Sequence, residues 1–553
     1  MEPLYTDYST AAFDADGVLT DFTLHAPENF NFAYDVVDRI AEKEPEKRAL
    51  VWCDTKGNEK TLSFGEISSL SVQAAGYLAA NGVKKGDRVL LIMKRHYEYW
   101  YILPALHRMG AVVIPASHML KKKDLVYRIQ SAEISAIISA DDSELTGNII
   151  AAKESCPSLQ HLFTVRKDYP GFLRLDLGLK EMPKSAKRIP TLASEPFLMY
   201  FTSGTTSYPK AVIHNGYYPL GHIPTAKYWH NCEDNGLHLT VADTGWAKAS
   251  WGKIYGQWMC GCAIMAYDYE HFDAAQMFSV IKKYNVTSFC APPTVYRLMV
   301  KNGIPADAFS CVRYATTAGE ALNPEITKRF QDITGLLIHE GFGQSETTLL
   351  LGNLVNAPVK IGSIGKPNPL YDVRIVDEEG NEAGVDERGE IVVFPKPNQC
   401  GLCIGYLNSE EQDRRVWKNG VFHTGDIATR DADGFFWYIG RTDDIIKSSG
   451  YRIGPFEIED VLIKHSAVAE CAVTGVPDEE RGFVVKATIV LMPGYTGTPE
   501  LAQELKEYVK TQTAPYKYPR IIDFVPELPK TISGKIQRAK LREQDAADAD
   551  TKL

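Results

Sequence analysis

Hydrophobic and polar positions in the first 140 residues alternate between two patterns. Apolar residues recur at helix-like spacing over residues 34–41 and 64–81, and compact apolar runs stand at 88–92 and 111–115. Helices and buried strands that alternate in this way are typical of βαβ units on a mostly parallel sheet. The pattern therefore predicts an α/β fold for this part of the chain.

The alternation returns in the middle of the chain. Strands are predicted over 286–290, 312–316 and 336–339, and Pro292 and Pro293 stand where a helix can begin. The first two strands run into small polar loops and the third runs into glycines. Because ligands bind outside the carboxyl ends of strands in open α/β sheets, we expect these loops to lie at a ligand site.

The pattern changes after about residue 380. Turn sequences (EEGNEAG, DERGE, DADG) separate short strands as far as residue 440, which predicts a small antiparallel region. Beyond the sequence RTDD a compact α+β pattern begins, so we place a domain boundary at 442–444. Its predicted elements are helices over 455–465 and 499–509 and strands over 468–474 and 484–491. The acidic end from Glu543 onward is expected to be frayed and solvated.

Composition narrows the class of protein. Of the 553 residues 44% are hydrophobic and 24% charged, as in soluble globular proteins. The 60 Lys and Arg against 70 Asp and Glu give a net charge of -10, which argues against nucleic acid or an anionic membrane as the main partner. No apolar run reaches the roughly 18 residues of a membrane span, and the start MEPLYTDYST resembles neither a signal nor a transit peptide. Together with ten scattered cysteines, these features predict a cytoplasmic protein.

Two spacings suggest metal ligands at first sight. His214, His222, His230 and His238 are eight residues apart, and Cys400 begins a CxxC motif. Prolines between the histidines prevent a shared helical face, and the CxxC has no second ligand pair nearby. We interpret the histidine spacing as coincidence and the cysteines as unreactive thiols.

The most informative window is YFTSGTTSYPKAV, residues 200–212. It gathers four hydroxyls around one glycine and ends in Pro209 and Lys210. Backbone N–H groups, hydroxyls and one ammonium together suit a triphosphate. A Ser/Thr-rich linker is the alternative, but a strand-like FLMYF before the window and the Pro-Lys after it disfavour a linker. No GxxxxGK[ST] sequence is present, which disfavours a P-loop NTPase.

This window resembles the phosphate-loop signature of the ANL superfamily of adenylating enzymes, which includes acyl-CoA synthetases, peptide-synthetase adenylation domains and firefly luciferase. Other windows match in order: TTAGEALNP (316–324), GFGQSETT (341–348), FHTGDIA (422–428), YIGRTDDIIKSSGYRIGPFEIE (438–459) and PKTISGKIQR (529–538). The sequences TAPYKYPR and GKIQRAKLR are similar to the medium-chain acyl-CoA synthetase branch. The resemblance implies an α/β fold with a large N-terminal domain of mostly parallel sheets over 1–441. A small, mobile α+β domain over 442–553 is implied to follow.

The resemblance also implies a two-step reaction. A carboxylate attacks the α-phosphorus of ATP to give an acyl-adenylate and pyrophosphate, and a thiolate then displaces AMP. Lys535 matches the lysine that bridges the carboxylate and the α-phosphate, and Glu346 matches the glutamate that holds Mg²⁺. Asp426 matches the acceptor of both ribose hydroxyls, Arg441 a second ribose contact, and Arg452 a contact to the phosphates of ATP. The other implied ATP-binding residues are Thr202, Ser203, Gly204, Thr205, Thr206, Lys210, Gly319, Glu320, Gly341, Phe342, Gly343, Gln344 and Ser345.

Three further assignments follow from the resemblance. Asp443 matches the hinge about which the C-terminal domain turns. The implied CoA-binding residues are Ser449, Gly450, Tyr451, Arg452, Arg481, Lys510 and Tyr518. The implied acyl pocket includes Trp246, Trp251 and Thr348.

The apolar spacing of Trp251, Ile254, Tyr255 and Trp258 is that of one helical stripe, for which core packing is the default explanation. Their bulk favours a short, branched or aryl acid over a long chain. Ser207 and Ala211 stand where the family commonly has glycine, which puts the mobility of the phosphate loop in doubt. Thr348 likewise replaces a frequent glycine, so chain length is not inherited from relatives.

We therefore expect an AMP-forming acyl-CoA synthetase with ATP, a carboxylic acid and CoA as small-molecule substrates, and with neither a nucleic-acid partner nor a membrane span. Three alternatives remain. The enzyme loads a carrier protein instead of CoA, it is a catalytically silent nucleotide- or acyl-binding regulator, or it runs an oxygen-using luciferase-like reaction that no sequence feature favours. The oligomeric state is open, and a homodimer is one alternative.

Overall fold

The computed structural model describes residues 3–202, 209–320, 322–397, 399–449, 451–478, 481–530 and 535–550. The chain forms two compact units, Met1–Val373 with Phe394–Gly420, and Arg374–Val393 with Val421–Leu553. These units do not divide the chain at residue 441, where the sequence predicts the mobile domain to begin, and that boundary stays a prediction. In the described part of the chain, no helix combines the length and apolar character needed to cross a membrane.

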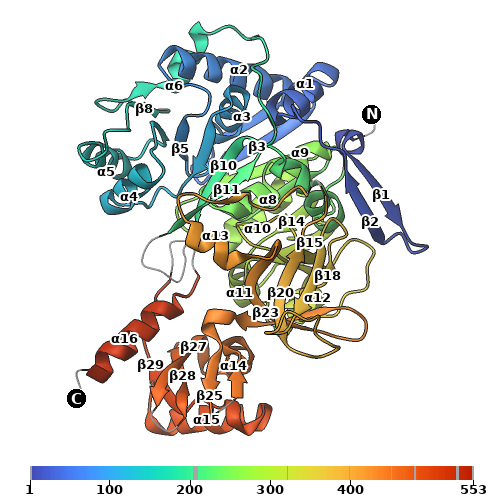
Figure 1. Cartoon of the computed structure of the whole chain (residues 1–553), viewed down its shortest axis with the longest axis vertical. Coiled ribbons are helices and arrows are strands. Elements are labelled where there is room, and N and C mark those ends of the chain that lie inside the picture. The colour runs from blue at the N-terminus through green and yellow to red at the C-terminus, as the bar shows by residue number, and fades with distance from the viewer. Residues whose placement is uncertain are drawn as a thin grey trace. The chain divides into compact units, whose positions relative to one another are not determined.

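An eight-stranded sheet forms one half of the first unit (Figure 1). Six of its strands are parallel, and the other two, at one edge of the sheet, are antiparallel to their neighbours. The strand order is β21 (Gly405–Tyr406), β11 (Lys210–Asn215), β10 (Pro196–Thr202), β6 (Val112–Pro115), β5 (Arg88–Ile92), β7 (Ala136–Ser139), β8 (His161–Thr164) and β9 (Leu173–Arg174). The helices of this half are α2 (Phe64–Ala80), α3 (Tyr99–Met109), α4 (Lys122–Ser131), α5 (Ser143–Lys153) and α6 (Leu175–Gly178).

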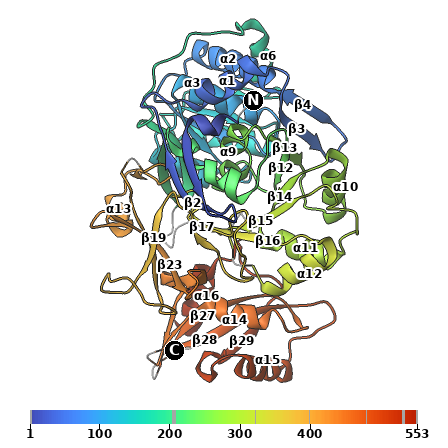
Figure 2. The ribbon, with the colours of Figure 1, turned by 90° about the vertical axis from the view of Figure 1, so that its right-hand side faces the viewer.

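A nine-stranded sheet forms the other half of the first unit. Its order is β18 (Lys366–Pro367), β17 (Leu351–Gly352), β16 (Ile338–Phe342), β15 (Tyr314–Ala318), β14 (Ser288–Cys290), β12 (Leu237–Thr240), β13 (Ala263–Asp268), β3 (Arg48–Asp54) and β4 (Glu59–Ser63). The strands from β16 to β3 are parallel, as predicted. Helices α10 (Ala274–Tyr284), α11 (Pro293–Asn302) and α12 (Pro324–Thr334) lie side by side next to this sheet (Figure 2). Their apolar sides and the sheet share one buried core.

Local signals explain why several elements begin where they do. The predicted helix over 64–81 is α2, and a capping box of Ser63 and Glu66 satisfies its first N–H groups. Helix α11 begins at Pro293 because proline fits the first helical turn. Strands β15 and β16 begin two residues later than predicted. The predicted helix over 34–41 is a π-helical segment, Ala33–Asp38, followed by α1 (Arg39–Lys43).

One predicted helix is wrong. The stripe from Trp251 to Trp258 does not lie on one helix: Trp251 lies on α8 (Ala247–Gly252), Tyr255 and Trp258 lie on α9 (Tyr255–Met259), and Ile254 lies between the two helices. The backbone leaves the helical region at Lys253 and Ile254, where φ is -134° and -165°. The side chains of the stripe are still buried, although no single helix carries them.

The remaining elements of the first unit are short. A hairpin of β1 and β2 stands apart from the two large sheets (Figure 1). The bounds of these elements are η1 (Leu4–Asp7), β1 (Ser9–Phe13), β2 (Leu19–Leu24), η3 (Leu179–Glu181), α7 (Tyr218–Gly221), η4 (Thr225–Trp229), α13 (Glu410–Val416) and β22 (Trp417–Lys418).

The second unit begins with antiparallel strands, and all but the first lie in the region where they were expected, from about residue 380 to residue 440. These are β19 (Asp372–Val376), β20 (Gly389–Phe394), β23 (Val421–Arg430) and β24 (Phe436–Arg441). A second sheet of β26 (Tyr451–Ile453), β25 (Ile446–Ser448), β28 (Gly482–Leu491), β27 (Val468–Asp478) and β29 (Ile521–Phe524) follows. The other elements of this unit are η5 (Thr442–Asp444), η6 (Pro515–Lys517) and the helices α14 (Pro455–Leu462), α15 (Pro499–Gln512) and α16 (Arg538–Asp550).

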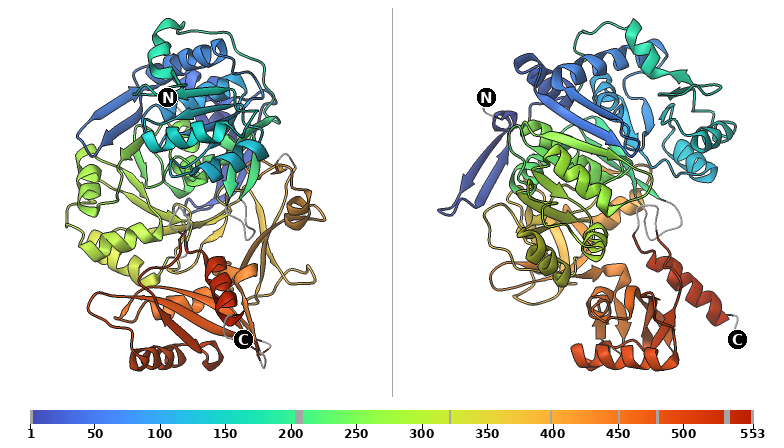
Figure 3. Two further views of the ribbon diagram at one scale, coloured as in Figure 1. Left: turned by 90° about the vertical axis from the view of Figure 1, so that its left-hand side faces the viewer. Right: turned by 180° about the vertical axis from the view of Figure 1, so that it is seen from behind.

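Alternate residues of β27 face the two sides of this second sheet. Val473 packs in a core with α14 and α15, whereas Ala472 packs with Leu541 of α16 on the other side (Figure 3). The prediction of a frayed acidic end is therefore wrong for its first part. Helix α16 continues to Asp550, and Asp545 accepts a hydrogen bond from Lys486 at 2.5 Å.

Candidate active site

Strands β10 and β11 flank the Ser/Thr-rich loop. Their antiparallel register places Thr202 opposite Lys210, and the Thr202 hydroxyl donates to the Lys210 carbonyl at 3.3 Å. The two ends of the motif are therefore adjacent on one edge of the eight-stranded sheet. The four predicted phosphate contacts within the loop, and one departure from the family pattern, lie outside the described residues: Ser203, Gly204, Thr205, Thr206 and Ser207.

The GFGQSETT segment begins in the last two residues of β16 and continues as a turn and short loop. Glu346 is held from two sides: the Tyr406 hydroxyl donates to its carboxylate oxygen Oε1 at 2.7 Å, and the Cys403 N–H donates to its carbonyl at 2.7 Å. The preceding carbonyl, that of Ser345, accepts a hydrogen bond from His214 Nε2 at 2.7 Å. Burial lowers the pKa of His214 to about 4, so the neutral ring is the donor.

Two glycines of this segment permit close packing. A Cβ at Gly341 would lie 2.6 Å from the Trp229 ring, and one at Gly343 would lie 2.4 Å from the Trp251 ring. The structure thus brings Trp251, a predicted acyl-pocket residue, directly against the predicted ATP-binding segment. Thr348, also predicted for that pocket, is buried and shares a hydrogen bond with Tyr371.

Trp246, the third predicted acyl-pocket residue, is half-buried and precedes α8. Phe342 ends β16, and the Gln344 N–H donates a hydrogen bond to the Thr347 hydroxyl oxygen at 3.0 Å. These residues belong to the same region of the first unit.

The predicted adenine turn follows β15. Gly319 has a φ of +103°, a conformation that favours glycine, and the Glu320 carboxylate accepts a hydrogen bond from Thr294 at 3.0 Å. A residue that the sequence analysis missed lies beneath this turn. Glu340 is buried, and its carboxyl group accepts hydrogen bonds from the N–H groups of Leu322 and Gly362. Burial raises the pKa of Glu340 to about 8, so the neutral acid is favoured at neutral pH.

The predicted ribose contacts meet in the second unit. Strands β23 and β24 place Asp426 opposite Arg441, and the guanidinium donates to Asp426 Oδ2 at 3.0 Å. The hydroxyl of Tyr438, which the sequence analysis missed, donates to Oδ1 at 3.0 Å. Asp426 is only 3% exposed, so both oxygens are fixed in direction within this hairpin. Tyr438 stands three residues before Arg441, and this short spacing was the only sign in the sequence that Tyr438 could reach the same carboxylate.

The predicted CoA-binding residues fall into separate groups of the second unit. Arg481 donates to the Ser449 hydroxyl at 3.1 Å, and the Lys510 ammonium lies 4.4 Å from the centre of the Tyr518 ring. Tyr451 is 50% exposed and stacks on Tyr516, with ring centres 4.1 Å apart.

Three further predicted residues of this unit have different surroundings. Arg452 pairs with Glu378 at 2.7 Å. Asp443, the predicted hinge, lies in η5, and the side chain of Lys535 is exposed. Gly450 lies outside the described residues.

Three of the four histidines suggested as metal ligands, His214, His230 and His238, have ordinary hydrogen-bond partners. The rings of His230 and His238 contact the hydroxyls of Thr316 and Ser288 at 2.8 and 2.6 Å. Burial raises the pKa of the Cys400 thiol to about 12, which makes it unreactive. Among the described residues, no group of three or more His, Cys, Asp or Glu side chains is arranged to hold a metal. A lone carboxylate such as Glu346 nevertheless fits Mg²⁺ bound with ATP, since phosphates and water supply the other ligands.

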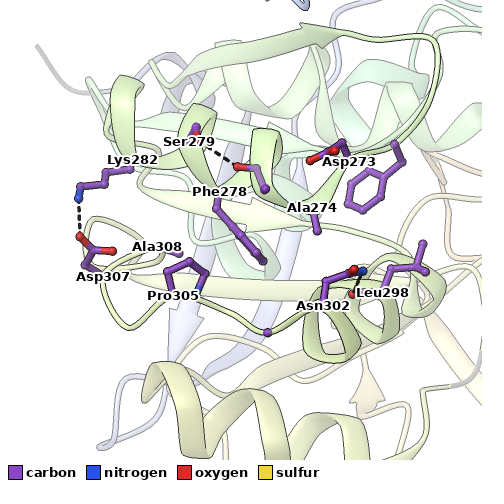
Figure 4. A pocket seen from close by; sticks show the side chains of 13 residues that line it. Asp273, Ala274, Phe278, Ser279, Lys282, Leu298, Asn302, Pro305, Asp307 and Ala308 are labelled. Carbon is purple, nitrogen blue, oxygen red and sulfur yellow. Dashed lines mark hydrogen bonds and ion pairs between the residues drawn. The ribbon is translucent and has the colours of Figure 1, made fainter.

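A cavity of about 610 Å³ lies elsewhere in the first unit, between α10 and α11 (Figure 4). Its charged side chains are already paired: Lys282 bonds Asp307, and Asp273 caps the first turn of α10. None of the predicted site residues lines it. The cavity is therefore not part of the candidate active site.

Comparison with known proteins agrees with this geometry. The sequence pattern of the AMP-binding enzyme family matches residues 37–406, and that of the AMP-binding enzyme C-terminal domain matches 457–535. Human acyl-coenzyme A synthetase ACSM3, mitochondrial, is 39% identical over 95% of this chain and 91% of its own. Mouse acyl-coenzyme A synthetase ACSM5, mitochondrial, is 40% identical over 94% of this chain and 91% of its own. The crystal structure of the anthranilate CoA ligase AuaEII with anthranoyl-AMP has a TM-score of 0.87 at 26% identity and covers 95% of this chain and 99% of its own.

These comparisons correct one prediction. The expected cytoplasmic location is wrong, because the curated relatives are named mitochondrial acyl-coenzyme A synthetases. The absence of a recognisable transit sequence was weak ground for that prediction, since targeting is carried by a removable segment that is unrelated to the fold.

The family resemblance, in contrast, is confirmed. Both domain patterns occur in the expected order, and the relatives match nearly the whole chain. The matched ranges contain Lys210, Glu346 and Lys535, the residues around which the site was predicted. This chain therefore belongs to the AMP-binding enzyme family.

Proposed function

We propose that this protein is an AMP-forming acyl-CoA synthetase. It would convert a carboxylic acid, ATP and CoA into acyl-CoA, AMP and pyrophosphate through an acyl-adenylate. The observation that carries the proposal is the set of contacts around Glu346. They fix a carboxylate on the same sheet edge as the strands that flank the Ser/Thr-rich loop. The names of the relatives support the same reaction.

The adenylation step needs groups that stabilise growing negative charge. In the first unit, Lys210 would contact the phosphates and Glu346 would hold Mg²⁺, which neutralises phosphate charge when it is bound. In the second unit, Asp426 would accept the ribose hydroxyls, with Arg441 beside it. The substrate carboxylate attacks the α-phosphorus and the bond to pyrophosphate breaks, while Lys535 would contact the carboxylate and the α-phosphate.

The thioester step needs CoA at the second unit. The thiolate of CoA attacks the acyl carbon and AMP leaves with the bonding electrons. Arg481, which donates to Ser449, and Lys510, which lies over the Tyr518 ring and pairs with Glu507, are half-buried cations of this unit that would suit the phosphates of CoA. These residues support CoA over a carrier protein as acceptor.

The acid is proposed to be short, branched or aryl. The Trp251 ring occupies the space beside Gly343, and Thr348 is tied to Tyr371 where a frequent glycine would leave room. Bulk at these positions shortens the space for an acyl chain. A neighbour of similar fold was solved with anthranoyl-AMP, an aryl adenylate.

A substrate panel tests this function. The full chain is incubated with acids from acetate to palmitate and with benzoates, ATP and Mg²⁺, with and without CoA. Pyrophosphate, AMP and acyl-CoA are followed by mass spectrometry, and formation of AMP and acyl-CoA from a short or aryl acid is expected. Formation of ADP, or no turnover of any acid, would refute the proposal. Best turnover of palmitate would refute the acid class alone.

The proposed hinge at Asp443 is tested by separating the two steps. Lys535→Ala is expected to abolish adenylate formation but still convert supplied acyl-adenylate to thioester, and Gly450→Leu to do the reverse, because a side chain there would obstruct pantetheine. Loss of the same step in both variants would contradict a two-orientation mechanism.

A further inference from the structure

Tyr406 contacts the side chain of Glu346 and was identified by no motif. It stands on β21, 60 residues beyond Glu346, and is only 7% exposed. Its hydroxyl donates to Glu346 Oε1 at 2.7 Å. The last torsion of a glutamate side chain has broad energy minima, so a carboxylate needs a partner to fix its direction. A hydrogen bond to one oxygen also fixes where the other oxygen points.

Tyr406 itself is held by the backbone. It pairs with Val212 of β11, two residues after Lys210, in the antiparallel edge of the eight-stranded sheet. Its N–H also donates to Asp413 of α13 at 2.9 Å. The hydroxyl is therefore carried on a sheet strand and not on a free loop.

The same helix reaches the other predicted phosphate contact. Gln412, next to Asp413 on α13, accepts a hydrogen bond from the Lys210 ammonium at 2.5 Å. The segment from Tyr406 to Asp413 thus contacts both Lys210 and Glu346. These two residues are 136 positions apart in the sequence (346 minus 210).

We propose that Tyr406 is a positioning residue that orients the Glu346 carboxylate toward the magnesium ion of bound ATP. This inference rests on the proposed function. It assigns to Tyr406 no contact with ATP itself, and it predicts an effect that depends on the metal. Loss of the hydroxyl should weaken binding of Mg²⁺–ATP and leave binding of metal-free ATP unchanged.

The test compares Tyr406→Phe with the unmodified full chain. Calorimetric titration without acid or CoA gives Kd for ATP with excess Mg²⁺ and with EDTA. We expect Kd to rise about tenfold with Mg²⁺ and less than twofold with EDTA. An equal rise in both would show a merely structural role, and no rise in either would show that the hydroxyl is irrelevant. Both results overturn the proposal.

Two further variants serve as controls for this test. Tyr267→Phe is the matched control, because that hydroxyl likewise donates to a side-chain oxygen, the amide Oε1 of Gln276 at 2.6 Å, away from the site. It should leave both values of Kd unchanged. In a Glu346→Gln background, Tyr406→Phe should add nothing further with Mg²⁺, and a further tenfold loss there would overturn the proposal.

The outcome is separable from that of the proposed function. If the unmodified chain forms AMP and acyl-CoA but Tyr406→Phe binds Mg²⁺–ATP as tightly, only the inference on Tyr406 fails. If the unmodified chain binds no ATP and turns over no acid, the proposed function fails with it.

Discussion

The two predicted halves of the ATP site are built in opposite ways. In the second unit, Asp426 and Arg441 face each other on adjacent strands of one hairpin, 15 residues apart. In the first unit, Glu346 and Lys210 are each held by residues from a distant segment, Tyr406 and Gln412. A local pair is visible in a sequence motif, whereas a partner that arrives through tertiary packing is not. The two halves should therefore respond differently to mutation.

The largest effect is expected in the local pair. Asp426→Ala removes the acceptor of two donors and leaves the Arg441 guanidinium without its carboxylate. We expect kcat/KM for ATP to fall at least 100-fold, which corresponds to a loss of about 2.7 kcal/mol in stabilisation of the transition state. Asp433→Ala, in the exposed turn of the same hairpin, is the control and should have less than a twofold effect. Equal effects of the two substitutions would contradict a specific role for Asp426.

The second prediction concerns Glu340, the buried residue beneath the adenine turn. Burial raises its pKa from the ordinary value of 4.5 to about 8, so the stabilisation by the neutral acid is complete below pH 4.5 and is lost as the pH rises toward 8. Glu340→Gln resembles the neutral acid and should remove this loss. The variant should therefore gain stability relative to the unmodified chain by roughly 2 kcal/mol between pH 5 and pH 7, given a slope of at most about 1.4 kcal/mol per pH unit.

The measurement for Glu340 is the difference in melting temperature between variant and unmodified chain at several pH values. It should grow as the pH rises from 5 to 8. A difference that stays constant with pH would show that Glu340 is ionised in the folded protein.

A smaller effect is expected where the first unit depends on close packing. Gly343→Ala places a Cβ 2.4 Å from the Trp251 ring and 2.5 Å from the Thr348 carbonyl, so one of these must move. We expect kcat/KM for the acid to fall about tenfold, with a change in the order of preferred acids. Gly147→Ala, in helix α5 with open space around it, is the matched control and should leave catalysis unchanged. If Gly343→Ala leaves the order of preferred acids unchanged, Trp251 does not help to select the acid.

Much of the fold was accessible from the sequence because the relevant signals are local. A compact apolar run predicted β5 closely and helix-like spacing predicted α2 closely, and the capping pair Ser63 and Glu66 fixes the start of that helix. The continuous stripe from Trp251 to Trp258 was misleading for a physical reason: burial of four apolar side chains does not require one helix, and two short helices achieve the same burial. The acidic end was likewise misjudged, since a single contact, Asp545 with Lys486, depends on a partner 59 residues away.

The candidate site shows the same difference between local and tertiary signals. The sequence by itself determined the residue types that phosphate, ribose and carboxylate chemistry needs, and their order along the chain, because these recur in short motifs such as GFGQSETT and FHTGDIA. Only the tertiary structure decided what holds them. Tyr406 reaches Glu346 because β21 adds to the edge of a sheet, and Glu340 reaches the adenine turn because β16 buries it beneath that turn. Hydrogen bonds of this kind depend on positions in space and not on spacing in the chain, so no local pattern of residues predicts them.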